Sequence, residues 1–272
     1  MSKADEILFK IGKANKMTFD CINNCYIYED CDGNRITITK EEQRIIDDYI
    51  SPVKHIDWER IEEKQRNKDK IILSLFDLTG NWSKPYKQNG YNVIQIDLQL
   101  GTDIMTWNYK EIPKENVYGI LAACPCTDFA LSGARHFARK DQDGSTEKSK
   151  QLVYKTLEIV DYFKPKFWVV ENPMSRIHKC CPELGQVKFK FNPCDFAGYC
   201  NDKIEQQENR YNKSTWLWGN FNNPIPKRLE PLQKESPIWT NPLKLPYGSI
   251  ELQNWRSKTP MGFAYAFYEA NK

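Results

Sequence analysis

The chain has 272 residues, of which 40% are hydrophobic and 28% are charged, and its formal net charge is +3 at pH 7. This length suffices for one large α/β domain with a small appendage, and the composition is that of an ordinary globular protein. The small net charge excludes a strongly basic overall field, so any binding of a polyanion must use local patches. The sequence holds no apolar stretch long enough to span a bilayer, and residues 1–5 lack the apolar core of a signal peptide. We therefore expect a cytoplasmic protein with no membrane partner.

Nine cysteines are spread along the chain. Because the number is odd and no export signal is present, we expect reduced thiols rather than a disulfide framework. A zinc site could be assembled from His178 with the cysteines at 180, 181, 194 and 200. Adjacent cysteines rarely serve as two ligands of one tetrahedral ion, so we favour ordinary thiols and no metal.

Residues 1–68 differ from the rest of the chain and contain no catalytic motif. They are predicted to hold a helix over 6–11, a hairpin of 25–28 and 35–38 around a turn at 32–34, and a second helix from Thr39 to Ser51-Pro52. Charged residues then dominate from 59 to 70, which indicates an exposed helix that leads into a linker. We therefore predict an accessory region over 1–68 and a main domain over 69–272.

The main domain begins with a nucleoside-binding pattern. Residues 71–76 form an apolar run typical of a buried strand, and a turn with Gly80, a helix through Gln88 and a second strand ending in Asp97 follow. An acid at this distance from the turn commonly accepts both hydroxyls of a ribose. The single glycine disfavours pyrophosphate binding, so a nucleoside ligand without phosphates fits better. Asp103 could contact an adenine amino group or cap a helix, and the sequence does not decide between these roles.

Two polar segments each follow a predicted buried strand. Cys124-Pro125-Cys126-Thr127 comes directly after the apolar run 117–123, and Glu171-Asn172-Pro173 comes directly after 167–170. The carboxyl ends of parallel strands hold the ligand site in open α/β sheets, so we expect a thiol and a carboxylate in one crevice. The long polar and aromatic segment after Cys126 is predicted to be a functional loop, and a helix follows over 146–163.

These elements predict an α/β fold: a doubly wound, mostly parallel sheet with helices on both faces and a small N-terminal α+β appendage. Residues 214–219 are predicted to form a late strand whose Trp216 and Trp218 belong to the core. The stretch 220–256 is rich in proline and precedes a final helix. It is the only sizeable segment left to act as a recognition insert.

Taken together and in this order, six segments resemble the small, phage-type DNA (cytosine-5-)-methyltransferases. They are Ser74-Leu75-Phe76-Asp77-Leu78-Thr79-Gly80, Ile96-Asp97, Cys124-Pro125-Cys126-Thr127, Glu171-Asn172-Pro173, Gln207-Glu208-Asn209-Arg210 and Thr259-Pro260-Met261-Gly262-Phe263-Ala264. The resemblance covers roughly residues 71 to 271. It implies a Rossmann-like methyltransferase fold and transfer of a methyl group from S-adenosylmethionine to carbon 5 of a cytosine flipped out of duplex DNA.

The resemblance also implies roles for individual residues. Cys126 would add to carbon 6 of the cytosine as a thiolate whose pKa is lowered by nearby positive groups, protonated Glu171 would donate to ring nitrogen 3, and Arg210 would hold the base or activate the thiol. Cys124 would be a buried structural thiol. The implied cofactor residues are Phe76, Asp77, Thr79, Gly80, Asp97, Asp103, Thr259 and Phe263. The implied substrate residues are Pro125, Thr127, Ser132 and Asn172, of which Asn172 would chiefly shape its loop.

The sequence departs from the family pattern at several positions. Cys124 stands where proline is usual, Thr127 stands where glutamine is usual, and the segment ending in Arg210 lacks the alternating arginines. Two alternatives therefore stay open: the same chemistry on RNA or a free cytosine nucleotide, and a catalytically silent DNA-binding relative. Retention of Cys126 and Glu171 favours the enzyme, because binding alone needs neither.

The resemblance sets expectations for the biological setting as well. It implies work in a bacterial or phage-infected host cytosol, in restriction-modification or in evasion of restriction. A monomer is favoured. Sequence reading normally needs a sizeable module in a DNA groove, so the short insert predicts a short or weakly specific target unless residues 1–68 supply the reader.

Overall fold

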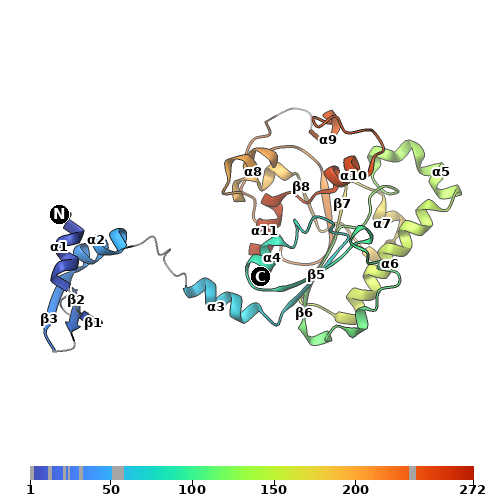
Figure 1. Cartoon of the computed structure of the whole chain (residues 1–272). Helices are drawn as coiled ribbons and strands as arrows, with labels where there is room; N and C mark the ends of the chain where they lie inside the picture. Colours follow the sequence, from blue (N-terminus) through green and yellow to red (C-terminus); the bar gives the residue numbers. More distant parts are fainter. Residues whose placement is uncertain are drawn as a thin grey trace. The chain divides into compact units, whose positions relative to one another are not determined.

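In a computed structural model, residues 3–11, 14–20, 23, 25–30, 33–50, 58–232 and 237–272 are described. The chain divides into two compact units, Met1–Glu59 and Arg60–Lys272 (Figure 1). Among the described residues, no helix combines the length and the apolar character that crossing a membrane requires.

The N-terminal unit is a three-stranded antiparallel sheet with two helices. Its elements are α1 (Lys3–Ile11), β1 (Ala14–Asp20), β2 (Cys25–Asp30), β3 (Arg35–Thr39) and α2 (Lys40–Ile50), with strand order β1-β2-β3. Thr39 and Glu42 form a reciprocal cap, because Thr39 Oγ1 accepts from Glu42 N at 3.2 Å and Glu42 Oε2 accepts from Thr39 N at 3.0 Å. A small core of Ile7, Ile38 and Ile46 joins the helices to the sheet.

Both predicted helices and the predicted hairpin of this unit are confirmed, whereas β1 was not predicted. Its residues Lys16-Met17-Thr18-Phe19-Asp20 alternate between polar and apolar, as in a half-buried strand, so the signal for β1 is present in the sequence. Asp32 of the predicted turn and the predicted helix end at Ser51-Pro52 lie outside the described residues.

The second unit is built on a six-stranded sheet with strand order β5-β4-β6-β7-β9-β8. The first four strands in this order are parallel, whereas β9 runs antiparallel to both β7 and β8. The strands are β4 (Ile71–Leu75), β5 (Asn92–Ile96), β6 (Val117–Ala122), β7 (Phe167–Pro173), β8 (Phe189–Phe191) and β9 (Thr215–Asn220). The helices are α3 (Trp58–Asn67), α4 (Lys84–Gln88), α5 (Phe137–Gln142), α6 (Ser145–Phe163), α7 (Ile177–Cys180), α8 (Lys203–Glu208), α9 (Pro237–Thr240), α10 (Ile250–Ser257) and α11 (Met261–Asn271).

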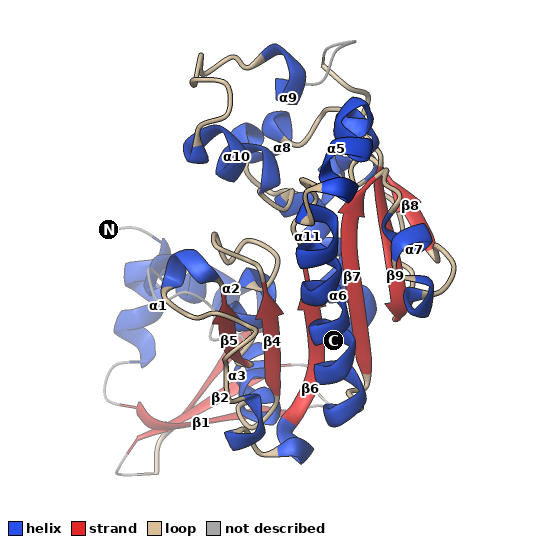
Figure 2. Cartoon of the chain, turned by 90° about the vertical axis from the view of Figure 1, so that its right-hand side faces the viewer, coloured by secondary structure: helices blue, strands red, loops and turns tan. Residues whose placement is uncertain are grey.

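Helices cover both faces of this sheet. Alternate residues of β4 enter different cores: Leu73 and Leu75 pack in a cluster with Val153 and Phe163 of α6, and Ile72 packs in a cluster with Phe267 of α11. Figure 2 shows the arrowheads of β4 and β7 directed toward the end of the unit where α5, α8 and α10 lie. The mostly parallel, doubly wound sheet predicted from the sequence is therefore confirmed.

The charged run before β4 belongs to the second unit. Asn67 of α3 is buried, and its Nδ2 donates to Asn89 O at 3.1 Å, while Glu63 accepts from Tyr268 OH of α11 at 3.1 Å. Gly90 sits against the same helix with φ +88°, where a Cβ would lie 2.5 Å from Lys64 O. The structure divides the chain between Glu59 and Arg60, before the predicted boundary at residue 68. The sequence did not indicate this, because the residues of α3 that face the core stand among exposed charged residues.

Candidate active site

The segment 124–131, here called the nucleophile loop, leaves the carboxyl end of β6. The amides of Phe129 and Ala130 both donate to Cys126 O, at 3.0 and 2.8 Å, so Cys126 begins a tight turn. Cys124 is buried, and its Sγ lies 3.8 Å from Thr156 Oγ1 of α6. Burial raises the pKa of Cys124 to about 12, so this thiol stays protonated and unreactive at neutral pH. Cys126, in contrast, is partly exposed.

Glu171 and Asn172 lie at the carboxyl end of the neighbouring strand β7. Asn172 is fully buried, and its Nδ2 donates to Cys124 O at 2.9 Å, which ties the nucleophile loop to β7. Its Oδ1 has no hydrogen-bond partner among the described residues. Asn172 therefore shapes the loop, which leaves Glu171 as the titratable group at this strand end.

The thiol, the carboxyl group and one ammonium group interact electrostatically. Burial raises the pKa of Glu171, and the Lys213 cation opposes that shift. Burial also raises the pKa of Cys126, with Glu171 adding to the shift and Lys213 and Lys140 opposing it. The net pKa of the thiol is therefore raised in the free protein, and not lowered as we expected from the sequence. A carboxyl group with a raised pKa is suited to donate a proton.

Lys213 takes the place beside this pair that we had expected for Arg210. Arg210 donates from Nε to Glu230 O at 2.8 Å, so its guanidinium group holds the segment that follows β9. Lys213 donates from Nζ to Arg256 O at 3.0 Å. Pro173 of β7 pairs with Thr215 of β9, so the residues just before β9 lie beside the end of β7. The antiparallel register of β9 is the signal that could have identified Lys213, and it is not visible in the local sequence.

A cavity lies at the carboxyl ends of β4, β5 and β6. Its lining residues are Phe76, Asp77, Leu78, Thr79, Asp97, Gln99, Ala123, Asn254, Ser257 and Thr259. Phe76 has φ +60°, a strained conformation for a non-glycine residue, and its amide donates to Ile96 O at 2.7 Å. Asn81 Nδ2 donates to Thr259 O at 3.2 Å, and this bond closes the C-terminal segment over the turn after β4.

Five of the eight predicted cofactor residues line this cavity: Phe76, Asp77, Thr79, Asp97 and Thr259. The Asp77 carboxylate accepts from Ser74 Oγ at 2.9 Å and from Ser83 Oγ at 3.3 Å, so it also organises the turn. Asp97 Oδ1 accepts from Gln99 N at 2.8 Å. Sequence reasoning missed Gln99 and Asn254, whose amide side chains hydrogen-bond each other at 2.9 and 3.1 Å across the cavity wall.

The other three predicted cofactor residues lie outside the cavity lining. Gly80 has φ +66°, and a Cβ there would lie 2.9 Å from Gln95 Nε2, so this position needs glycine for the turn itself. Asp103 caps its own turn, because its Oδ1 accepts from Met105 N at 2.9 Å. Phe263 is fully buried and stacks on Phe191 with ring centroids 4.1 Å apart. Its role in this structure is packing of the aromatic core.

Truncation of Phe263 is expected to destabilise the fold rather than to remove a ligand contact. Phe263→Ala should lower the free energy of unfolding by about 3–5 kcal/mol, because the stacked core is left with a cavity. Glu269→Ala on the exposed side of the same helix should change it by less than about 0.5 kcal/mol. Chemical denaturation measures both values. Weakened cofactor binding by Phe263→Ala at unchanged stability would contradict this assignment.

The four predicted substrate residues differ in the exposure of their side chains. Pro125, Thr127 and Ser132 have exposed side chains, whereas Asn172 is buried.

The described cysteines are all free thiols, and the described part of the chain brings no three His, Cys, Asp or Glu side chains together as a metal site. Cys194 Sγ instead donates to Asn212 Oδ1 at 3.4 Å.

The parallel strands, the antiparallel β9 and a crevice at the strand ends define the class of Rossmann-like methyltransferase folds. Residues 64–180 match the family of C-5 cytosine-specific DNA methylases, and the match covers the strands β4 to β7. The chain is also similar to a probable DNA (cytosine-5)-methyltransferase of Frog virus 3 (isolate Goorha). The two sequences are 26% identical over 170 residues, which cover 57% of this chain and 73% of the relative. The family match includes Cys126 and Glu171 and ends before Lys213.

Proposed function

We propose that this protein transfers a methyl group from S-adenosylmethionine to carbon 5 of cytosine in DNA through a covalent adduct with Cys126. The observation that carries the proposal is that Cys126 and Glu171 lie at the carboxyl ends of the neighbouring parallel strands β6 and β7, where Asn172 Nδ2 ties the loop of Cys126 to β7 at 2.9 Å. Ala123, shortly before Cys126, lines the neighbouring cavity. The family match and the name of the viral relative agree with this activity.

The cavity residues fit S-adenosylmethionine. Asp97 follows β5 and offers a carboxylate of the kind that accepts ribose hydroxyls. The turn after β4 has one glycine and no basic side chain in the cavity lining, which suits a ligand without phosphates. The residues that would hold the cofactor are Phe76, Leu78, Asp97, Gln99 and Asn254. When bound, S-adenosylmethionine supplies an electrophilic methyl group.

Cys126 and Glu171 have complementary tasks in the mechanism. Carbon 5 of cytosine is a poor nucleophile until the ring accepts an electron pair at carbon 6. The Cys126 thiolate forms the new S–C bond at carbon 6, and neutral Glu171 gives its proton to nitrogen 3, so the ring becomes a neutral enamine that is nucleophilic at carbon 5. Burial keeps Glu171 in the required acid form to a higher pH than a free glutamate.

Lys213 is suited to stabilise two anions in succession. Before addition, its ammonium group favours the Cys126 thiolate against the cost of burial. After Glu171 has given its proton to the base, the same cation faces the new Glu171 carboxylate. A preorganised charge in a partly desolvated site contributes more than the same charge would in water.

The two units differ in charge, which bears on DNA recognition. Residues 1–59 contain 8 Lys and Arg against 12 Asp and Glu, so the N-terminal unit is acidic and the excess of positive charge lies in the second unit. An acidic unit is poorly suited to contact the phosphate backbone. We therefore assign DNA binding to the second unit and keep the expectation of a short or weakly specific target.

Replacement of Lys213 should slow catalysis and move its pH dependence. Lys213→Met is expected to lower kcat by about 10²-fold, because one preorganised charge near the reacting groups is lost. Without the cation the pKa of Cys126 rises further, so the limb of the pH–rate profile that rises with thiolate formation should move to higher pH. Lys213→Arg should recover part of both effects. A profile of kcat/KM against pH for the three proteins checks this, and an unshifted profile in Lys213→Met would exclude the role.

The proposed reaction can be tested with labelled S-adenosylmethionine and a panel of cytosine substrates. We expect label on carbon 5 of cytosine in unmodified duplex DNA, and much less label in RNA of the same sequence or in cytidine triphosphate. Label found only in RNA or only in the nucleotide would identify that molecule as the substrate in place of DNA. No label on any of them, with calorimetry showing that the cofactor binds, would indicate a silent relative.

A further inference from the structure

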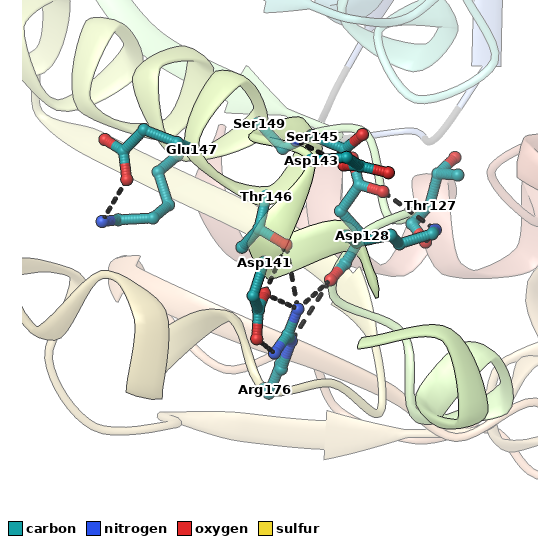
Figure 3. A network of polar contacts seen from close by, with 11 residues as sticks. Thr127, Asp128, Asp141, Asp143, Ser145, Thr146, Glu147, Ser149 and Arg176 are labelled. Carbon is teal, nitrogen blue, oxygen red and sulfur yellow. Dashed lines mark hydrogen bonds and ion pairs between the residues drawn. The ribbon is translucent and has the colours of Figure 1, made fainter. Parts of the chain in front are cut away.

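The nucleophile loop is anchored from the side of α5 by a buried lysine, whose partners Thr127 and Asp128 are labelled in Figure 3. Lys140 of α5 is buried, donates from Nζ to the carbonyl oxygen of Thr127, and lies 2.8 Å from Asp128 Oδ1. The second carboxylate oxygen, Asp128 Oδ2, accepts from Ser149 Oγ of α6 at 2.6 Å. The two residues directly after Cys126 are therefore bound to two different helices.

An arginine anchors the same loop from the side of β7. Arg176 donates from Nε and Nη2 to Asp128 O at 3.3 and 3.2 Å. It also makes a two-pronged contact with Asp141 of α5, from Nη1 to Oδ2 at 2.9 Å and from Nη2 to Oδ1 at 2.7 Å. Its guanidinium carbon lies 3.7 Å from the ring centre of Phe137. This fork fixes α5, the loop and the end of β7 in one arrangement.

Backbone hydrogen bonds extend this anchoring along the loop. The amide of Arg176 donates to Phe129 O at 2.9 Å, and the amide of Leu131 donates to Met174 O at 3.0 Å. Ala130 and Ser175 form an antiparallel bridge. The loop that carries Cys126 is thus held to residues 174–176, which directly follow the strand that carries Glu171, by bonds that cross between the two segments.

The geometry points to Lys140 and Arg176 as positioning residues for the nucleophile loop. Their contacts with Asp128 and Asp141, here called the lock, hold Cys126 at a fixed place relative to Glu171. The inference rests on the proposed function, because it takes Cys126 as the nucleophile. A buried ammonium group is costly unless it is paired and fully hydrogen-bonded, and here its partners are the two residues that follow the nucleophile. The hydrogen bonds of Asp141 to Arg176 and Thr146 lower its pKa to about 2, so this side of the lock stays ionised at neutral pH. Misplacement of a reacting group by about 1 Å can cost about 10²-fold in rate.

Two variants loosen the lock in different ways, and a third serves as control. Arg176→Lys keeps the charge and loses the fork. Lys140→Met combined with Asp128→Asn removes both members of the buried pair, so neither charge is left unpaired. Lys150→Met removes a lysine–carboxylate pair of similar geometry, Lys150 Nζ to Glu147 Oε2 at 2.7 Å, on α6 away from the loop. Thermal unfolding establishes that each protein is folded.

The readouts are steady-state methyl transfer to DNA and the rate at which iodoacetamide alkylates Cys126, located by peptide mass. In both lock variants we expect kcat to fall about 10²-fold with little change of KM for DNA. Alkylation should become severalfold faster, because a loosened loop exposes a thiol that is only partly exposed in the wild type. Lys150→Met should match the wild type in both.

Folded lock variants with wild-type alkylation and kcat would overturn the inference. So would slower alkylation, since it would mean that Lys140 acts on the charge of the thiol alone. If the wild-type protein transferred no methyl group, the proposed function would fail. The alkylation rates would still decide whether the lock holds Cys126.

Discussion

Cys126→Ala is expected to reduce methyl transfer to DNA by roughly 10⁴-fold or more, because no other group in the site can form the bond to carbon 6. The matched control is Cys124→Ala. Cys124 packs against Thr156 and has a pKa raised to about 12, so its removal should leave kcat within a few-fold of wild type. It should lower the free energy of unfolding by about 1 kcal/mol through lost packing. Methyl transfer is measured with labelled cofactor, and stability is measured by denaturant titration.

The opposite outcome would reassign the nucleophile. If Cys124→Ala were inactive while folded and Cys126→Ala retained activity, the reacting thiol would be the one directed toward α6. Activity in both single variants would exclude the covalent route through this loop.

Glu171→Gln is expected to lower kcat by about 10²–10⁴-fold, because glutamine keeps the shape of the side chain and cannot act as the acid. Burial raises the pKa of Glu171, so activity that depends on its proton should fall as pH rises through that pKa. This falling limb should be missing from the residual activity of the variant. The pH–rate profiles of the two proteins test this directly, and an unchanged falling limb would assign it to another group.

The same substitution has an opposite expected effect on stability. A group whose pKa is raised in the folded protein stabilises the fold fully below its unfolded pKa, and this contribution is lost as pH rises through the folded pKa. Wild-type protein should therefore lose stability over that range, whereas Glu171→Gln should not. A variant that is less active yet relatively more stable at high pH would separate a catalytic role from a structural one.

Local sequence patterns predicted the parts of the site that depend on single strands. The apolar runs before Cys126 and Glu171 identified β6 and β7, and parallel pairing brought the two strand ends together. The pairing of Asn172 with the Cys124 carbonyl group also agrees with the predicted shaping role. These features follow from short-range periodicity and one topological rule.

Features that depend on distant segments were not predictable in this way. Lys213 reaches the site through the register of β9, and Gln99 meets Asn254 only when the C-terminal segment closes over the sheet. The motif around Phe263 resembles a cofactor-binding segment, yet the Phe263 ring packs in the aromatic core. Lys140 and Arg176 lie in polar stretches that have no distinguishing spacing, and only the folded loop gives them their partners.

The proposed mechanism requires a covalent bond between Cys126 and carbon 6 of cytosine. Duplex DNA containing 5-fluorocytosine tests it most directly, because fluorine cannot leave carbon 5 as a proton does and the adduct persists. With S-adenosylmethionine present, we predict a trapped complex of one protein with one DNA, with the modification on the peptide containing Cys126 and none in Cys126→Ala. A protein that methylates ordinary DNA but is not trapped, or that is trapped through a different cysteine, would contradict the mechanism.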